Sequence, residues 1–306
     1  MKQILVVQYS QSGQLIEVLS RLIEPLRAAP DCEVHVLTLR PRTPYPFPWP
    51  LLRFFDTFPE AVHLDAPELE PLELGPDPRF DLVILGYQVW FLSPSLPVTA
   101  FLKGEAGRRI LQGTPVVTVV ACRDMWLMAQ EQMKSLLATA GARLVGHVAL
   151  VDAAGTAGSF LATPLWMLTG SRGPRLGGLI PRAGVQQEQI EATRRFGERI
   201  AAALKTNAPL DADLLKNLQA VRVNTGLIAS ERAIRRGLRA WGSLLRGLGP
   251  QGCWRRKPAL VAYFLWLVLA ILLLVPLGFL LKALLGPLRR KRLEAQRTYF
   301  GAPSGE

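Results

Sequence analysis

Cysteine and histidine are scarce in this chain of 306 residues, and their scarcity excludes several kinds of site. The three cysteines, Cys32, Cys122 and Cys253, show no paired spacing, which argues against a disulfide framework and for a reducing compartment. With three histidines the sequence offers neither a cluster of metal ligands nor a Ser-His-Asp arrangement. A Walker loop is missing as well. We therefore expect no metal site.

Acidic residues are rare in the last quarter of the chain, and basic residues are concentrated there. From Val221 onward the sequence has fifteen Lys or Arg but three Asp or Glu, so the whole net charge of +12 lies in this part. A basic chain often binds nucleic acid, but these basic residues flank a long apolar run. We therefore expect membrane lipids as partners, and no nucleic acid.

Charged residues are absent from residues 259–281, a run as long as a bilayer-spanning helix. We predict a single transmembrane helix over 258–282 and a basic tail over 283–306. Both flanks are basic, so the positive-inside rule does not orient the tail, and Pro276 and Gly278 leave a re-entrant or in-plane anchor open. Met1 and Lys2 lead straight into an apolar run without a signal peptide, so we expect a cytoplasmic N-terminal domain.

A basic amphipathic helix is predicted before the apolar run, over residues 227–248. Its apolar stripe comprises Ile234, Leu238, Trp241, Leu245 and Leu248, and its polar side carries Arg232, Arg235, Arg236 and Arg239. This pattern suits a helix at a membrane interface, and a helix packed on the protein with a solvated basic face is the alternative. We treat residues 206–257 as a basic amphipathic linker.

The beginning of the chain joins an apolar run, a polar loop and a helical pattern. Residues 4–7 are all apolar, as in a strand buried on both faces. The loop is Ser10, Gln11, Ser12, Gly13 and Gln14, and apolar residues then follow at helical spacing from Leu15. Amides, hydroxyls and the positive end of a helix converge in such a turn, which predicts an anion site. An ordinary strand-to-helix turn is the alternative.

Further apolar strands alternate with helices up to residue 205. The strands are predicted over 33–39, 81–86, 115–121 and 144–151, and the helices from 15, from 96, over 126–140 and over 185–204. This alternation predicts an α/β domain, residues 1–205, with a doubly wound parallel sheet of five strands. Its ligand should lie where the strands end, beside the loops that follow 86 and 121.

Two insertions interrupt this pattern. Residues 41–78 are dense in Pro and aromatics, so we expect an ordered loop with one short helix near 51–58, lying across the domain or against lipid. Residues 153–183 are rich in Gly and Thr, and we expect a short helix there. His147 falls inside a predicted strand, where a structural role is expected.

The polar loops resemble those of flavodoxins and flavin-dependent quinone reductases. The resemblance rests on Ser10 to Gly13, on DLVILGYQVWFLSPSLPVTAFL at 81–102 and on residues 117–126. It implies a flavodoxin-like fold and bound FMN, with the phosphate held by the loop Ser10 to Gln14. The residues that it implies beside the flavin ring are Tyr87, Gln88, Val89, Trp90, Cys122, Arg123, Asp124 and Trp126. Leu15 stands where flavodoxins usually have a further hydroxyl.

Longer stretches resemble flavodoxin-like proteins known as dialkylresorcinol condensing enzymes. They are YSQSGQL, PYPFPWPLLRFFDTFPE, GYQVWFLSPSLP and ACRDMWLMAQE. The resemblance implies a membrane-anchored aromatase that oxidises a lipid-like cyclic dione to a resorcinol, beside a ketosynthase of the same pathway. Removing two hydrogens from a ring needs a hydride acceptor and a base. Arg123 and Asp124 are the catalytic candidates, and a surface ion pair is the alternative for both.

Other functions remain open from the sequence. The first is a flavodoxin-like electron carrier or an NAD(P)H-quinone reductase at the membrane, although the aromatic insertion argues against a carrier, which needs an exposed flavin edge. The second is a scaffold without flavin, which the apolar Leu15 in the phosphate loop suggests.

Overall fold

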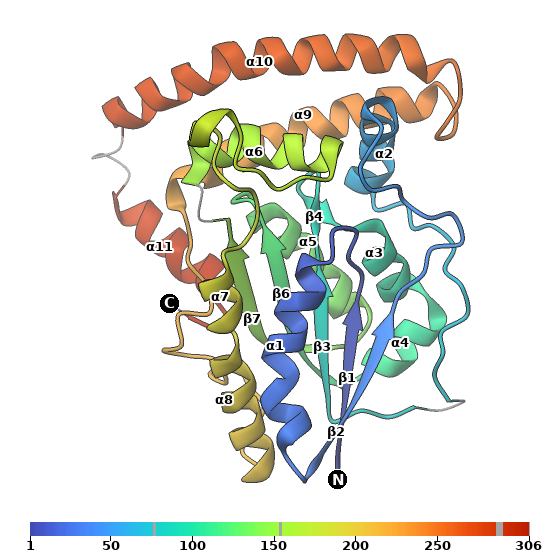
Figure 1. The fold of residues 1–306 in the computed structure, drawn as a ribbon, viewed down its shortest axis with the longest axis vertical. Helices are drawn as coiled ribbons and strands as arrows, with labels where there is room; N and C mark the ends of the chain where they lie inside the picture. Colours follow the sequence, from blue (N-terminus) through green and yellow to red (C-terminus); the bar gives the residue numbers. More distant parts are fainter. Residues whose placement is uncertain (76–77, 153–154, 286–289, 306) are drawn as a thin grey trace.

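Five parallel strands form one sheet in the order β2-β1-β3-β6-β7 (Figure 1). The strands are β1 (Lys2–Gln8), β2 (Cys32–Thr38), β3 (Leu82–Tyr87), β6 (Pro115–Cys122) and β7 (Arg143–Val151). This is the flavodoxin-like strand order, so the predicted fold class is confirmed. The computed structural model describes residues 1–306 except 76–77, 153–154, 286–289 and 306, and gives only the backbone of 155–160, 274–285 and 290–292.

Helices cover both faces of the sheet (Figure 1). One face packs against α1 (Gln14–Ala28), α7 (Gln187–Glu191) and α8 (Arg194–Lys205), and the other against α3 (Leu96–Lys103), α4 (Glu105–Leu111) and α5 (Leu127–Thr139). Alternate residues of a strand point to opposite faces. Ile4 and Val6 therefore join the core under α1, while Leu5 and Val7 join the core under α3 to α5. This double burial explains the unbroken apolar runs.

The helix predicted over 185–204 is two helices, α7 and α8, separated at Ala192 and Thr193. The Thr193 hydroxyl donates to the carbonyl oxygen of Ile190 at 2.6 Å and so competes with the helical hydrogen bonds. The helix also begins later than predicted, because both backbone groups of Val185 are bound to the side chain of Gln14. The predicted strands, by contrast, agree with the structure to within one residue at most ends.

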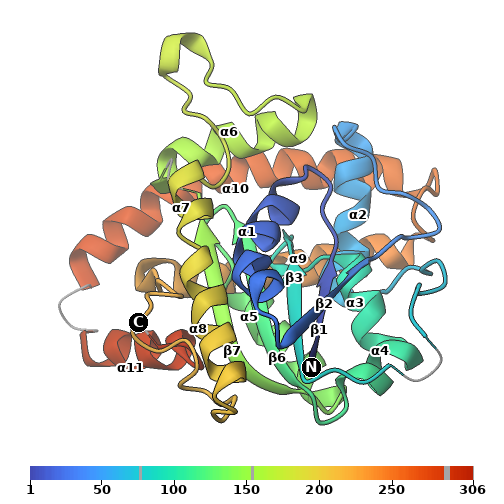
Figure 2. The ribbon, with the colours of Figure 1, turned by 60° about the horizontal axis from the view of Figure 1, so that its bottom comes forward.

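Four further helices cover the carboxyl end of the sheet (Figures 1 and 2). They are α2 (Leu51–His63), α6 (Gly155–Thr169), α9 (Ile228–Gly247) and α10 (Arg256–Leu285), and we call them the roof. The predicted linker contains α9, whose Leu238 and Leu245 are buried in the core beside α2. Among the described residues, α10 is the helix long and apolar enough to cross a membrane.

The Pro-rich insertion lies across the domain, as one of the two expected placements has it. Tyr45 and Trp49 pack against each other and against Trp90 of the small ribbon formed by β4 (Val89–Trp90) and β5 (Ser93–Pro94), and Phe54 packs against Trp49. Its helix, α2, extends to His63, five residues beyond the short helix that was predicted. The part of the insertion that the structure describes is therefore packed on the domain, with α2 in the roof.

The C-terminal end of the chain returns to the domain. The helix α11 (Arg290–Gly301) brings Phe300 into the core, where it is 1% exposed. Ser304 then pairs with the edge strand β7: its hydroxyl accepts from the amide of His147 at 2.6 Å and donates to the carbonyl oxygen of the same residue at 2.7 Å. The described part of the predicted basic tail is therefore docked on the domain.

A buried ion cluster fixes the start of α10 to α2. Arg256 is 1% exposed and binds Asp56 at 3.3 Å and Glu60 at 2.7 Å. Its guanidinium also donates to the carbonyl oxygen of Gly249, and Asp56 accepts from the amide of Gly252. These contacts join α2, the turn after α9 and the first turn of α10 into one unit.

Replacing Arg256 should destabilise the protein strongly. Arg256→Ala leaves the carboxylates of Asp56 and Glu60 buried without their cation, which costs about 3–5 kcal/mol. Arg255→Ala is the matched control, because Arg255 is the exposed neighbour of the same charge. Unfolding followed by circular dichroism in detergent should show a large loss for the first variant alone. Equal losses in the two variants would contradict the role of the cluster.

Candidate functional site

A loop suited to an anion joins β1 to α1. Gly13 precedes the helix with φ at 83°, and its amide donates to the hydroxyl of Ser10 at 3.1 Å. No side chain of the described residues caps the N-terminus of α1. The first amides of a helix lack intrahelical partners, so here they keep their capacity to bind an anion. The local geometry is therefore compatible with an anion site, which stays a prediction.

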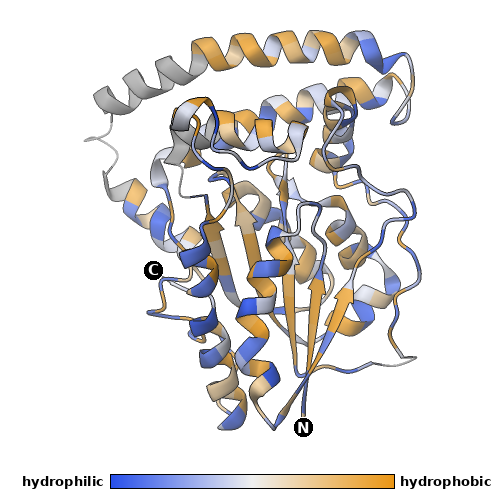
Figure 3. Ribbon diagram, viewed as in Figure 1, coloured by the Kyte–Doolittle hydropathy of each residue, from blue (hydrophilic) through white to orange (hydrophobic). Residues whose placement is uncertain are grey.

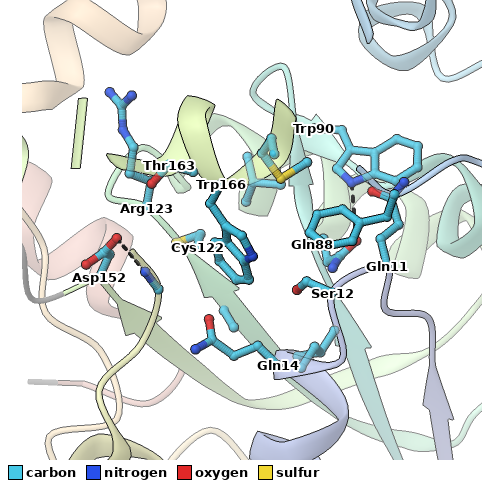
Figure 4. Close-up of a pocket in the computed structure, with 16 residues that line it drawn as sticks. Gln11, Ser12, Gln14, Gln88, Trp90, Cys122, Arg123, Asp152, Thr163 and Trp166 are labelled. Carbon is cyan, nitrogen blue, oxygen red and sulfur yellow. Dashed lines mark hydrogen bonds between the residues drawn. The ribbon is translucent and has the colours of Figure 1, made fainter. Parts of the chain in front are cut away.

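A cavity of about 140 Å³ lies beside this loop, at the carboxyl end of the sheet (Figure 4). Its walls come from the loop, from the segments after β3 and β6, and from α6. The predicted site residues that line it are Gln11, Ser12, Gln14, Gln88, Val89, Trp90, Cys122 and Arg123. Strands far apart in sequence therefore bring their loops together as the strand-end rule predicts. Ser10 and Gly13 lie in the same loop, behind this lining.

Two predicted site residues, Tyr87 and Trp126, lie in the core and away from the cavity. Tyr87 is fully buried on the α5 side of the sheet, where its hydroxyl donates to Gln130 at 2.7 Å. Its neighbour Gln88 lines the cavity, because successive residues of an extended chain point in opposite directions. Trp126 is 1% exposed and packs on the ring of His147, with 5.0 Å between their centroids. Both residues thus support the site from the core.

The side chains of Gln11 and Gln14 hold the loop in place. Gln14 pairs with both backbone groups of Val185, at 2.9 and 3.1 Å, and so ties the loop to the start of α7. Gln11 donates to the carbonyl oxygen of Pro46 and accepts from the indole of Trp49, which ties the loop to the insertion. The contribution of these two residues to an anion site would therefore come from their backbone amides.

Several residues of the cavity were missed in the sequence. They are Phe47, Asp152, Thr163, Trp166, Met167 and Gly184. Asp152 directly follows β7 at the carboxyl end of the sheet, so the strand-end rule could have identified it. Trp166, from α6, points into the middle of the cavity between Cys122 and Gln14 (Figure 4). Nothing in the Gly- and Thr-rich insertion of which it is part indicated this position.

Charged groups gather on one side of the cavity. Burial lowers the pKa of Arg123, whose charge is offset by Asp124 and Asp152 nearby. Asp152 is 4% exposed and accepts from the amide of Gly184 at 2.9 Å. Asp124 does not line the cavity; it accepts from Asn224 at 3.5 Å in an exposed contact. Of the two predicted catalytic candidates, Arg123 thus faces the cavity, and Asp152 is the carboxylate beside it.

Cys122 lines the cavity without being an activated nucleophile. Burial raises the pKa of its thiol well above the ordinary value, and the carboxylates of Glu231 and Asp124 add to the effect. A thiol that stays protonated near neutral pH is a poor nucleophile. His147 stays neutral for the same reason, since burial lowers its pKa to about 3, which agrees with the structural role predicted for it.

A buried carboxylate of α9 binds the start of α5, the helix that follows β6. Glu231 is fully buried, and its Oε2 accepts from the amide of Met128 in the first turn of α5 at 2.9 Å. Its Oε1 has no partner among the described residues. Burial raises the pKa of Glu231 to about 7, although the backbone hydrogen bonds oppose this shift. Glu231, a group that titrates near neutral pH, thus joins α9 of the roof to the start of α5.

Stability should fall as the pH rises through the range in which Glu231 ionises. The folded state binds this proton more tightly than the unfolded chain, so stability is lost from about pH 4.5 to about pH 7, by about 3 kcal/mol. Glu231→Gln should remove this slope and be the more stable protein at pH 8. Glu198→Gln, at an exposed residue of α8, is the control. Melting temperatures from pH 5 to 8 measure the effect, and an unchanged slope in Glu231→Gln would contradict it.

Comparisons with known proteins return flavoproteins. No family model and no curated protein matches the chain. A flavoprotein in complex with FMN from Lactobacillus acidophilus is 14% identical over 49% of this chain and 93% of its own, with a TM-score of 0.40. A flavodoxin from the domain Archaea is 13% identical over 67% and 99%, with a TM-score of 0.37. A flavone reductase is 13% identical over 67% and 63%, with a TM-score of 0.36. At these identities the similarity concerns the fold alone.

Proposed function

We propose that the protein is an FMN-dependent oxidoreductase that acts on an apolar, ring-shaped substrate at a membrane. The observation that carries the proposal is the uncapped start of α1, placed directly beside a cavity lined by Trp90, Trp166 and Phe47. A phosphate and an aromatic ring joined by a short chain need these two surroundings side by side. In a flavodoxin-like sheet this place is the switch point where FMN binds.

The residues fit the two ends of FMN to different degrees. The amides of Ser12 and Gln14 and the hydroxyl of Ser12 would hold the phosphate, while the amide of Gly13 is bound to Ser10 and the apolar Leu15 offers only its backbone amide. The segments Gln88 to Trp90 and Cys122 to Arg123 would flank the ring. The cavity, however, is smaller than the roughly 300–1,000 Å³ of typical ligand sites, because Trp166 occupies its middle. Binding would therefore require the indole of Trp166 to move outward with α6.

The reaction proposed is the oxidation of a lipid-like cyclic dione to a resorcinol, as the resemblance to dialkylresorcinol enzymes implies. When bound, FMN would accept the hydride. Arg123 would bind a ring oxygen of the substrate, and Asp152 would accept the proton that leaves the ring. The aromatic wall of Trp90, Tyr45 and Trp49 would exclude water from this place. A ketosynthase acting earlier in the same pathway would supply the dione.

The phosphate loop can be tested with two matched glycines. Gly13→Ala forces a side chain into a backbone with φ at 83°, which should shift the loop and weaken FMN binding by about tenfold or more. Gly113→Ala imposes the same strain at φ 72° in a turn remote from the site, again with open space around the added Cβ. Fluorescence titration of the detergent-purified protein with FMN measures both. A protein that binds no FMN at all would contradict the proposed function.

The position of Trp166 leads to a second prediction. Trp166→Ala should lower the apparent Kd for FMN by about tenfold, because the closed state that competes with the cofactor loses its main contact. Leu161→Ala is the control, since Leu161 lies on the same helix but is 57% exposed. Quenching of flavin fluorescence gives the Kd of each variant. Weaker binding in Trp166→Ala would instead mean that the indole stacks on the flavin.

Turnover separates the aromatase from the other flavin-dependent functions. An electron carrier needs an exposed flavin edge, and the roof over the cavity disfavours it. We expect the FMN-loaded protein to convert a dialkylcyclohexanedione to the resorcinol, detected by the absorbance of the new aromatic ring. Reduction of a quinone by NAD(P)H without that conversion would favour the quinone reductase. Asp152→Asn should remove the conversion while FMN remains bound.

A further inference from the structure

The helix α10 lies over α9 and α2 as the outermost helix of the roof (Figure 1). Its described side chains are mostly hydrophobic (Figure 3). Leu260 and Tyr263 are buried against α2 and α9, and the Tyr263 ring contacts Phe58 and Trp241 at 4.4 and 5.6 Å. The other side is apolar and 37–66% exposed; it comprises Val261, Phe264, Leu265, Trp266, Val268, Leu269, Leu272 and Leu273. A continuous apolar face of this length calls for a partner.

The position of α11 limits what α10 can do. The 30 residues of α10 extend about 45 Å, and a helix that crossed the roughly 30 Å hydrocarbon core would leave its C-terminal end on the far side. Four residues connect Leu285 to Arg290, and they reach about 18 Å at most when extended. Yet Tyr299 donates to Glu131 at 2.8 Å, and Phe300 and Ser304 are buried in the domain. A link of this length cannot bring α11 back across the membrane.

We propose that α10 does not span the bilayer but lies in the plane of one leaflet, with both of its ends on the side of the catalytic domain. The predicted transmembrane helix thus becomes a one-sided anchor. This inference rests on the membrane association proposed above and specifies how the protein attaches. The exposed face of α10 enters the acyl region, while α2 and α9 remain at the headgroup level.

The basic residues around this face favour an anionic bilayer as its partner. Between Glu231 and Glu294 the sequence has thirteen Lys or Arg and no acidic residue. Three exposed basic residues of α9 are Arg232, Arg236 and Arg239. Arg255 and Lys257 are exposed at the start of α10. Each basic residue near an anionic surface adds about 1 kcal/mol to membrane binding. A second copy of the chain would instead bring two basic surfaces together.

The orientation has a consequence for the site. The carboxyl end of the sheet points toward α10, so the cavity lies on the side of the domain nearest the bilayer (Figure 1). The helix α6, which carries Trp166 into the cavity, lies at the same carboxyl end of the sheet as α10 (Figure 1). A substrate with alkyl chains would therefore reach the cavity from the leaflet without leaving it.

Binding is tested first, with the full chain added from detergent to preformed vesicles of phosphatidylcholine and phosphatidylglycerol in equal amounts. The protein should float with these vesicles, and Leu265→Glu with Leu269→Glu should lower the bound fraction at least about tenfold. Val36→Glu, at an exposed apolar residue of the edge strand β2, should float normally. Absence of flotation would overturn the membrane proposal and the in-plane proposal together. A double variant that floats normally but changes from dimer to monomer would overturn the in-plane proposal, because this face would then bind a second copy of the chain.

The in-plane arrangement is tested with a membrane-impermeant maleimide on the intact vesicles. The folded domain cannot cross the bilayer, so it stays outside. Ala208→Cys, exposed after α8, marks this side, and Ala302→Cys, exposed after α11, marks the C-terminal end. We expect equal labelling of the two variants above that of the unsubstituted chain. Ala302→Cys that reacts only after detergent is added would overturn the in-plane anchor and leave membrane binding and flavin binding intact.

Discussion

Burial of a parallel sheet on both faces is the constraint from which the rest of this structure follows. Neither face can be left to water, so α1, α7 and α8 cover one and α3 to α5 the other. The loops are thereby confined to the two ends of the sheet, and those at the carboxyl end meet at the start of α1. The polar loop Ser10 to Gln14 lies there, between the uncapped start of α1 and the cavity.

The roof converts this open end into an enclosed site. Arg256, Asp56 and Glu60 join α10 to α2, and Glu231 joins α9 to the first turn of α5. The buried charge of Arg256 is tolerated only when it is paired with Asp56 and Glu60, so this cluster fixes the position of α10 relative to α2. Aromatic side chains fill the space between roof and sheet. The site thus combines a polar loop for an anion with apolar walls for a ring.

Docking of the C-terminal residues on the domain positions the apolar face of α10, which we propose to be the face that contacts a membrane. Ser304 satisfies both backbone groups of His147 on the outer edge of β7, and the carbonyl oxygen of Ala220 accepts from Ala149 on the same edge, so this edge strand is protected. With α11 held there, α10 spreads over the top of the domain and exposes one apolar side. The face that suits lipid and the end of the sheet that suits a ligand therefore point in the same direction.

The sequence by itself determined the sheet, the polar loop before α1 and about half of the cavity lining, because apolar runs and strand ends are local properties of the chain. It could not place Tyr87, since the face that a strand residue occupies depends on register and on the helix packed there. Trp166 and Asp152 entered the site only through folding of distant segments. The apolar run at 259–281 showed its length and its lack of charge. Our proposal that it lies along a membrane rests instead on the docking of Phe300 and Ser304, a contact between residues that no local pattern connects.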